Sequence, residues 1–171
     1  APNARNAHPH FGKTKRVVVV QNGIVENFLE LKDELMAEGV EFQSETDTET
    51  IVHLVEHYLA TGMGLVEAAR TTFNQIQGAN VVVLMSADEP DKIVTARIGN
   101  AGGVVLGQGD GENFIASDTP AILEHTRNVI FLESRQMAVV TCNSLTIETL
   151  EGASIQPQVH SVSWDPIAAE K

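Results

Sequence analysis

The sequence predicts an α/β fold with four layers, in which two stacked β-sheets lie between outer layers of helix (α/β/β/α). Amphipathic helices fall in the first half of the chain, and many short strands follow them. Two strands, Val17–Val20 and Val81–Leu84, are apolar without alternation. Strands of that kind need cover on both faces, which favours stacked sheets with outer helices over a sheet with one face in water.

The first half of the chain is expected to hold one strand and three helices. Arg16–Asn22 is a β-branched run that ends at Asn-Gly, which is typical of a buried strand. The spacing of apolar residues predicts helices over Asn27–Glu38 and Leu65–Gln77. Between them, Thr46 and Glu49 have the spacing of a capping box, so a helix is expected to begin with Thr46 as its N-cap.

From residue 79 onward the pattern changes to strands separated by turn residues. Asp118, followed by Thr119-Pro120, predicts a short helix that runs to about residue 124. The strands of this half are expected at Asn80–Ala87, Lys92–Ile98, Val104–Gly107, Asn113–Ala116, Val129–Leu132, Gln136–Thr141 and Leu145–Leu150.

Composition narrows the class of protein. The 171 residues suit one domain, and 11 Lys and Arg against 23 Asp and Glu give a net charge of −12. This balance argues against binding to nucleic acid or to an anionic membrane. The single cysteine, Cys142, excludes an internal disulfide, and no apolar run is long enough to span a membrane. We therefore expect a cytoplasmic domain.

Asn22-Gly23 is the first candidate for chemistry. It ends a predicted buried strand, and a helix follows it instead of a second strand. The Gly23 N–H and the Asn22 side-chain amide are then two donors at a strand end, which suits an oxyanion hole. An ordinary turn is the alternative, and the pattern alone favours that alternative.

Three further features have ordinary explanations beside a functional one. His8 and His10 flank a proline and could ligate a metal, but nothing nearby completes a ligand set, so a surface loop or a substrate-orienting histidine is favoured. Asp47 is one of three acids at a predicted helix start, where helix capping explains it, although it could also hold a substrate ammonium. We interpret Cys142 as structural, because no histidine lies near it in the sequence.

Several stretches, taken together, resemble the glutaminase domain (class II glutamine amidotransferase) of the glucosamine-6-phosphate synthases, the isomerising glutamine–fructose-6-phosphate aminotransferases. The resemblance covers essentially the whole chain and implies the N-terminal-nucleophile hydrolase sandwich. In order, the stretches are NARNAHPH at Asn3–His10, VVVQNGIVEN at Val18–Asn27, SETDTE at Ser44–Glu49, GENFIASD at Gly111–Asp118, EHTR at Glu124–Arg127 and WDPIAAEK at Trp164–Lys171.

The resemblance implies a reaction and assigns roles to four residues. In this family a cysteine at the mature N-terminus attacks the side-chain amide of glutamine, with its own α-amine as the base. Asn22 and Gly23 match the oxyanion hole, Asp47 matches the aspartate that binds the α-ammonium, and His8 matches a histidine of the glutamine pocket. The ammonia passes to a sugar-isomerase domain that converts fructose 6-phosphate to glucosamine 6-phosphate. The resemblance implies no metal and no other cofactor.

The departures from the family pattern define what is expected of this chain. The catalytic cysteine, the substrate-closing loop and the first strands of the sandwich have no counterpart in residues 1–171, and Gln21 stands where the family has histidine. We therefore expect a glutaminase-domain fragment, inactive by itself, whose parent forms a homo-oligomer through the isomerase domain. The alternative is a non-catalytic module that binds glutamine or another amino acid, with Asn22, Asp47 and His8 as ligand contacts only.

Overall fold

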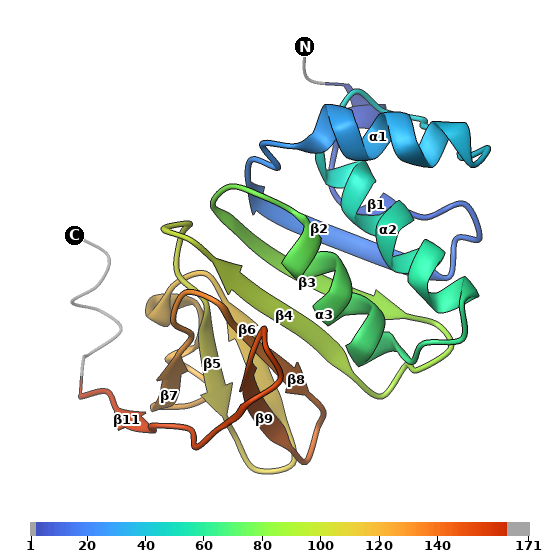
Figure 1. The fold of residues 1–171 in the computed structure, drawn as a ribbon. Coiled ribbons are helices and arrows are strands. Elements are labelled where there is room, and N and C mark those ends of the chain that lie inside the picture. The colour runs from blue at the N-terminus through green and yellow to red at the C-terminus, as the bar shows by residue number, and fades with distance from the viewer. Residues whose placement is uncertain (1–2, 164–171) are drawn as a thin grey trace.

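The computed structural model describes residues 3–163, which form two antiparallel sheets with helices outside them (Figure 1). The larger sheet has the strand order β1-β2-β3-β4-β8-β9-β10, and the smaller has the order β11-β7-β5-β6. The larger sheet comprises β1 (His10–Phe11), β2 (Val17–Gly23), β3 (Asn80–Ser86), β4 (Ile93–Ile98), β8 (Gln136–Val140), β9 (Leu145–Thr149) and β10 (Ser154–Ile155). The smaller sheet comprises β5 (Val105–Gln108), β6 (Asn113–Ala116), β7 (Asn128–Phe131) and β11 (His160–Ser161).

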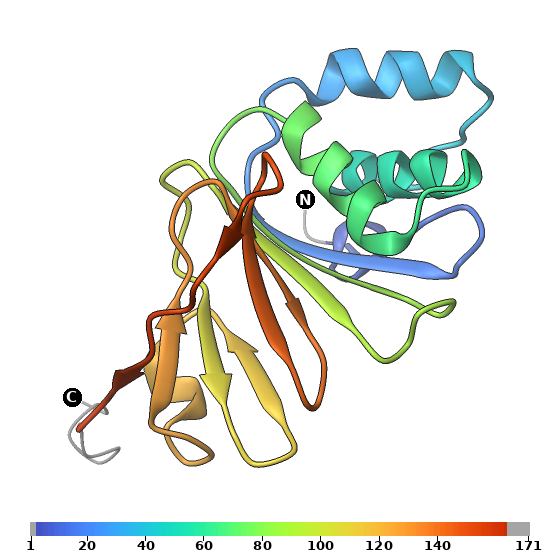
Figure 2. The same cartoon turned by 60° about the horizontal axis from the view of Figure 1, so that its bottom comes forward.

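Helices α1 (Phe28–Ala37), α2 (Thr48–Ala60) and α3 (Leu65–Gln75) cover one face of the larger sheet, and the smaller sheet lies on its other side (Figure 2). The main core lies under the helices, where α2 contacts β2 and α3 contacts β4. Phe73 of α3 is its largest fully buried side chain.

A second apolar cluster joins the two sheets. It contains Leu106 and Ile130 of the smaller sheet and Ala138, Val140 and Ile147 of the larger one. The smaller sheet therefore covers the β8–β9 end of the larger sheet, and the outer face of the smaller sheet packs against the 3-10 turn Thr119–Ile122. The predicted four-layer order is confirmed, and in residues 3–163 this turn occupies the place of the second helical layer.

The predicted strands and helices are present, and most of their ends agree within two residues. The predicted short helix after Asp118 is a 3-10 helix, Thr119–Ile122, with Asp118 as its N-cap, and it ends two residues earlier than predicted. Trp164–Lys171 lies outside the described residues. No helix in residues 3–163 has the length and apolar character needed to cross a bilayer.

The prediction that Val17–Val20 is covered on both faces is half wrong. Val17 and Val19, under the helices, are 1% and 0% exposed, whereas Val20 on the opposite face is 39% exposed. The cause is the position of the smaller sheet, which packs on β8 and β9 and leaves the far face of β2 and β3 partly open.

Candidate functional site

The end of β2 has a backbone that only glycine can supply. Gly23 has a φ of +139°, and a Cβ atom there would lie 2.1 Å from the carbonyl oxygen of Ala79. Such a contact cannot be accommodated without moving the backbone, and the φ value is one that other residues rarely adopt. Gly23 is therefore required by the close approach of the chain entering β3, and another turn-forming residue could not take its place.

The Gly23 N–H points away from β3. Ile24 N–H donates to the carbonyl of Ala79, which makes Ile24 a hydrogen-bonded position in this antiparallel pairing. Hydrogen-bonded and non-hydrogen-bonded pairs alternate along such a ladder, so Gly23, which pairs with Asn80, falls in a non-bonded pair. On its other side β2 pairs with β1 only at Val18 and Val19, so the Gly23 N–H faces the space beyond the end of β1.

Asn22 presents its side chain to the space between the sheets. It is exposed, and its Nδ2 atom would lie 3.4 Å from a Cβ placed on Gly102. Adjacent side chains of a strand alternate between its faces, so Asn22 and Gln21 point to opposite sides of the larger sheet. Within residues 3–163 the Asn22 amide has no protein hydrogen bond, which leaves it free to donate beside the Gly23 N–H.

Asp47 connects the loop after β2 to the first turn of α2. It is the N-cap residue of α2, and its Oδ2 atom accepts a hydrogen bond of 2.6 Å from the N–H of Val25. No other protein donor within the described part of the chain contacts the carboxylate. One oxygen thus holds the loop, and the other is available to a cationic group at the site.

The predicted capping box at the start of α2 is wrong. The helix begins at Thr48 with Asp47, not Thr46, as its N-cap. The hydroxyl of Thr46 instead contacts Nε2 of His10 at 3.1 Å, and Glu49 accepts from the N–H groups of Ser44 and Gln43. The acids of this segment therefore connect other parts of the chain, which a local pattern does not show.

His8 is connected to the end of β2 by hydrogen bonds that pass through the Thr48 hydroxyl. Its Nε2 atom lies 3.2 Å from the Thr48 hydroxyl oxygen, and that hydroxyl donates to Oε1 of Gln21 at 2.7 Å. The Gln21 amide then donates to Oδ1 of Asn80 at 2.7 Å. Gln21 therefore connects the strand, the helix and His8 behind the Asn22-Gly23 pair.

A cavity of about 310 Å³ lies between the sheets at this point. The polar residues that line it are His8, Gln21, Asn22 and Ser117. Its apolar residues include Val20, Val81, Val83 and Ile115. The structure thus brings His8, Asn22, Gly23 and Asp47 to one end of β2, although they are spread over 40 residues of sequence. Asn22 and His8 border the cavity, and Asp47 contacts the loop that follows Gly23.

Comparison with known proteins gives a family. The glutamine amidotransferase domain family matches residues 2–124. The chain belongs to that family. It is 44% identical over 99% of its length to the glutamine–fructose-6-phosphate aminotransferase [isomerizing] of Methanothermobacter thermautotrophicus and to that of Thermococcus kodakarensis. It covers 28% of each of these proteins, so it spans little more than a quarter of the length of the curated relatives it matches.

Solved structures agree on the fold. The glutamine phosphoribosylpyrophosphate amidotransferase from B. subtilis, complexed with ADP and GMP, superimposes with a TM-score of 0.68 at 20% identity. The match covers 84% of this chain and 31% of that chain. A second structure, of the allosteric regulatory enzyme of purine biosynthesis, gives a TM-score of 0.69 at 20% identity over 84% of this chain and 30% of that chain. The amidotransferase domain therefore has the N-terminal-nucleophile hydrolase type of fold.

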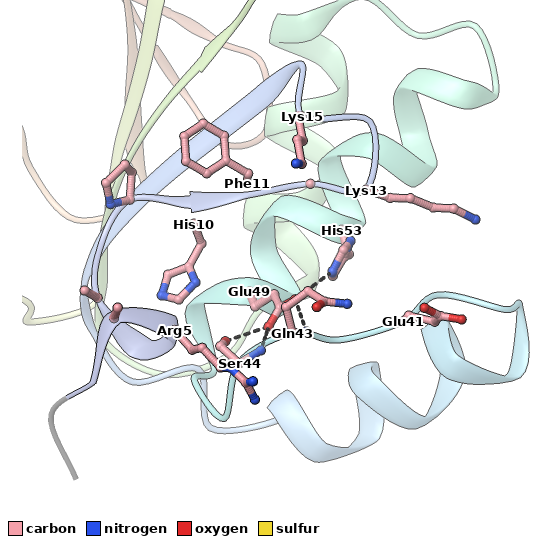
Figure 3. Close-up of a pocket in the computed structure, with 14 residues that line it drawn as sticks. Arg5, His10, Phe11, Lys13, Lys15, Glu41, Gln43, Ser44, Glu49 and His53 are labelled. Atoms are coloured by element: carbon pink, nitrogen blue, oxygen red, sulfur yellow. Dashed lines mark hydrogen bonds and ion pairs between the residues drawn. The ribbon is translucent and has the colours of Figure 1, made fainter.

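The amidotransferase domain has a larger cavity, of about 610 Å³, that contains none of the four predicted site residues (Figure 3). Glu49 and His53 are among the residues that line it, and the two side chains are hydrogen-bonded at 3.2 Å (Figure 3). Burial would raise the pKa of the Glu49 carboxyl, but hydrogen bonds from Ser44, Gln43 and His53 outweigh burial and lower the pKa below its usual value. Glu49 is thus an ionised, fully bonded structural group.

The side chains of His8 and His10 both make contacts within the protein. The rings lie edge to face with centroids 5.2 Å apart, and each Nε2 atom contacts a threonine, Thr48 or Thr46. Burial, reinforced by the neighbouring His8, lowers the pKa of His10, so that ring is neutral at pH 7. Within residues 3–163 no three His, Cys, Asp or Glu side chains are grouped to hold a metal ion.

Three residues that support the site carry no motif that predicts this role. Thr48 and Asn80, which are 2% and 0% exposed, complete the hydrogen bonds behind Gln21. Asn27 accepts from the N–H of Gln77 at 2.9 Å and donates to the carbonyl of Gln75 at 3.1 Å, so it holds the loop after Gly23 against the end of α3. Among these three residues, only Asn80 had a local feature that could have drawn attention to it, namely a polar side chain at the start of an apolar strand.

We predict that Glu49→Gln destabilises the fold by about 2 kcal/mol at pH 7, because a neutral amide accepts the buried N–H groups less well than a carboxylate. The lowered pKa means that the ionised carboxylate stabilises the folded state above pH 4.5, the usual value for glutamate. This contribution is lost as the pH falls through the lowered folded-state pKa. Urea unfolding at several pH values should show the difference between the two proteins shrinking toward acid.

The matched control is Glu30→Gln. Glu30 also lies in the first turn of a helix, α1, but it is exposed and has no such hydrogen bonds. Its substitution should change the free energy of unfolding by no more than about 0.5 kcal/mol. Equal losses for both variants would show that a general helix-end effect, and not the Glu49 contacts, is responsible.

Proposed function

We propose that the protein containing this chain hydrolyses the side-chain amide of glutamine and that residues 1–171 supply its oxyanion hole and part of its glutamine pocket. The observation that carries the proposal is the end of β2, where the Gly23 N–H and the Asn22 amide are two free donors and the Asp47 carboxylate holds the N–H of Val25, two residues further on. Fixed donors of this kind stabilise the charge that develops on a carbonyl oxygen under nucleophilic attack.

The proposed reaction needs a nucleophile that this chain does not place at the site. Its one cysteine, Cys142, is exposed and lines a different depression, with Met85 and Asn113. We infer that a cysteine outside the 171 residues attacks the amide carbon, that ammonia leaves, and that water hydrolyses the thioester to glutamate. The chain is then a fragment of a glutaminase domain.

We further propose that the ammonia is used by a sugar-isomerase domain of the same protein, in the conversion of fructose 6-phosphate to glucosamine 6-phosphate. The support is that the relatives are glutamine–fructose-6-phosphate aminotransferases, which extend well beyond the matched region. A cytoplasmic location, and a homo-oligomer formed through that second domain, belong to the same proposal.

Asn22→Ala in the full-length protein tests the function directly. Loss of one oxyanion donor should lower kcat for ammonia release from glutamine by roughly 100- to 1,000-fold. Asn143→Ala, at an exposed turn between β8 and β9, should leave kcat unchanged. An Asn22→Ala enzyme with normal kcat would remove Asn22 from the oxyanion hole.

Asp47→Asn should weaken glutamine binding while it keeps the loop in place. Asparagine retains a carbonyl oxygen for the Val25 N–H, but it loses the charge that would pair with the substrate ammonium. We expect KM for glutamine to rise about tenfold or more, which corresponds to about 1.4 kcal/mol, with a smaller change in kcat. Asp33→Asn, an exposed acid of α1, is the control, and an equal KM in both variants would exclude an ammonium-binding role.

The 171-residue chain by itself should release no ammonia from glutamine above background, because the reacting thiol is missing from the site. Calorimetry on the same chain separates the two functional classes. Tight glutamine binding without hydrolysis would favour the non-catalytic binding module, and ammonia release at rates typical of an enzyme would refute the inferred external nucleophile.

A further inference from the structure

Behind the proposed site, four side chains form one continuous line of hydrogen bonds that starts at a backbone carbonyl. Nδ2 of Asn80 lies 3.3 Å from the carbonyl oxygen of Gln77, and Oδ1 of Asn80 accepts from Nε2 of Gln21 at 2.7 Å. Oε1 of Gln21 accepts from the Thr48 hydroxyl at 2.7 Å, and the Thr48 oxygen lies 3.2 Å from Nε2 of His8. The line joins the start of β3, the end of β2, the first turn of α2 and His8.

The carbonyl end gives this line a direction. A backbone carbonyl only accepts hydrogen bonds, so Asn80 must direct its NH₂ group to Gln77 and its oxygen to Gln21. Gln21 must then direct its own NH₂ group to Asn80 and its oxygen to Thr48. Neither amide titrates, and Asn80 and Thr48 are 0% and 2% exposed, so water has little access to take the place of either partner.

The direction of these hydrogen bonds determines which ring nitrogen of His8 carries the hydrogen. The Thr48 hydroxyl has one hydrogen, which it donates to Gln21, so its oxygen accepts from His8. Nε2 of His8 must therefore carry a hydrogen, and in the neutral ring Nδ1 is the nitrogen with the free lone pair. We propose that Gln21, Thr48 and Asn80 are positioning residues that hold neutral His8 in the Nε2–H tautomer.

This tautomer specifies what His8 can recognise. The free Nδ1 atom accepts a hydrogen bond, so the substrate group that it binds is an N–H donor, which in glutamine is the ammonium or the carboxamide NH₂. A carboxylate would meet only a lone pair there. The choice of glutamine rests on the proposed function, whereas the tautomer rests on the hydrogen bonds alone.

The tautomer can be measured without substrate. Long-range ¹H–¹⁵N spectra of the chain labelled with ¹⁵N-histidine distinguish the two neutral forms, with His8 identified by loss of its signals in His8→Gln. At a pH where the histidines are neutral, His8 should show the Nε2–H form only. The exposed His160, with no hydrogen bond in the described structure, supplies the mixture expected of an unconstrained ring. A detectable Nδ1–H form of His8 in the native chain overturns the proposal.

Two pairs of variants test whether the positioning residues set this state. Gln21→Met removes the acceptor of the Thr48 hydroxyl, which can then donate to His8, so the Nδ1–H form should appear. Gln21→Glu loses the donor to Asn80 but keeps an acceptor oxygen for the Thr48 hydroxyl, so it should retain the Nε2–H form. If either Gln21 variant fails to fold, Thr48→Val and Thr48→Ser make the same comparison, with the mixture expected for valine and the native state for serine. Unchanged tautomers in Gln21→Met or Thr48→Val overturn the proposal.

A second readout ties the tautomer to the site. In the full-length protein, Thr48→Val should raise KM for glutamine about fivefold, the equivalent of one lost hydrogen bond, with kcat changed less, and Thr48→Ser should restore KM. Equal KM values for the valine and serine variants would overturn the link between the tautomer and binding. A protein with the expected tautomers that neither binds nor hydrolyses glutamine would refute the proposed function and leave the tautomer assignment intact.

Discussion

The rest of the site depends on the hydrogen bonds that side chains at the start of α2 make with other segments. Three consecutive residues of this turn bind three different parts of the chain: Asp47 the loop after β2, Thr48 the strand itself, and Glu49 the segment that enters the helix. Because the helix N-terminus carries a partial positive charge, acids are favoured there even when their side chains point elsewhere. One helical turn thereby holds the end of β2 in place on the helix-covered side of the sheet.

The two faces of the larger sheet differ in how far they are covered. The face under the helices carries the main core and is closed to solvent, and it also buries the polar chain from Asn80 to Thr48. The smaller sheet covers the opposite face mainly at β8 and β9, and the end of β2 borders a cavity. A strand with Gln21 on the packed side and Asn22 on the open side can therefore be rigid and still present donors to a ligand.

Most elements could be predicted from the sequence because their signals are local. The β-branched run of β2, the helical spacing of α1 and α3, and the turn residues between later strands all act within a few residues. Asn22-Gly23 was also recognisable as an unusual strand end, because the hairpin that Asn-Gly usually forms has no second strand here. The local pattern left both an ordinary and a functional explanation open for Asp47 and His8, and the resemblance favoured the functional one.

The start of α2 shows where local reasoning failed. Thr46 and Glu49 have the spacing of a capping box, but both side chains have partners elsewhere, His10 for one and the Ser44–Gln43 backbone for the other. Local reasoning also missed the supporting residues Thr48, Asn80 and Asn27. Each of them is hydrogen-bonded to a residue more than 25 positions away in the sequence. Only β2–β3 pairing and the docking of α2 bring these partners together.

The sequence by itself determined the class of fold, the acidic single-cysteine composition and the unusual strand end at Asn22-Gly23, because composition and short-range patterns are properties of neighbouring residues. The tertiary structure decided which face of β2 is open, which residue caps α2, and which way the hydrogen bonds run from Gln77 to His8. These features depend on contacts between segments far apart in the chain, and a side chain with several possible partners takes the one that the packed fold places within reach.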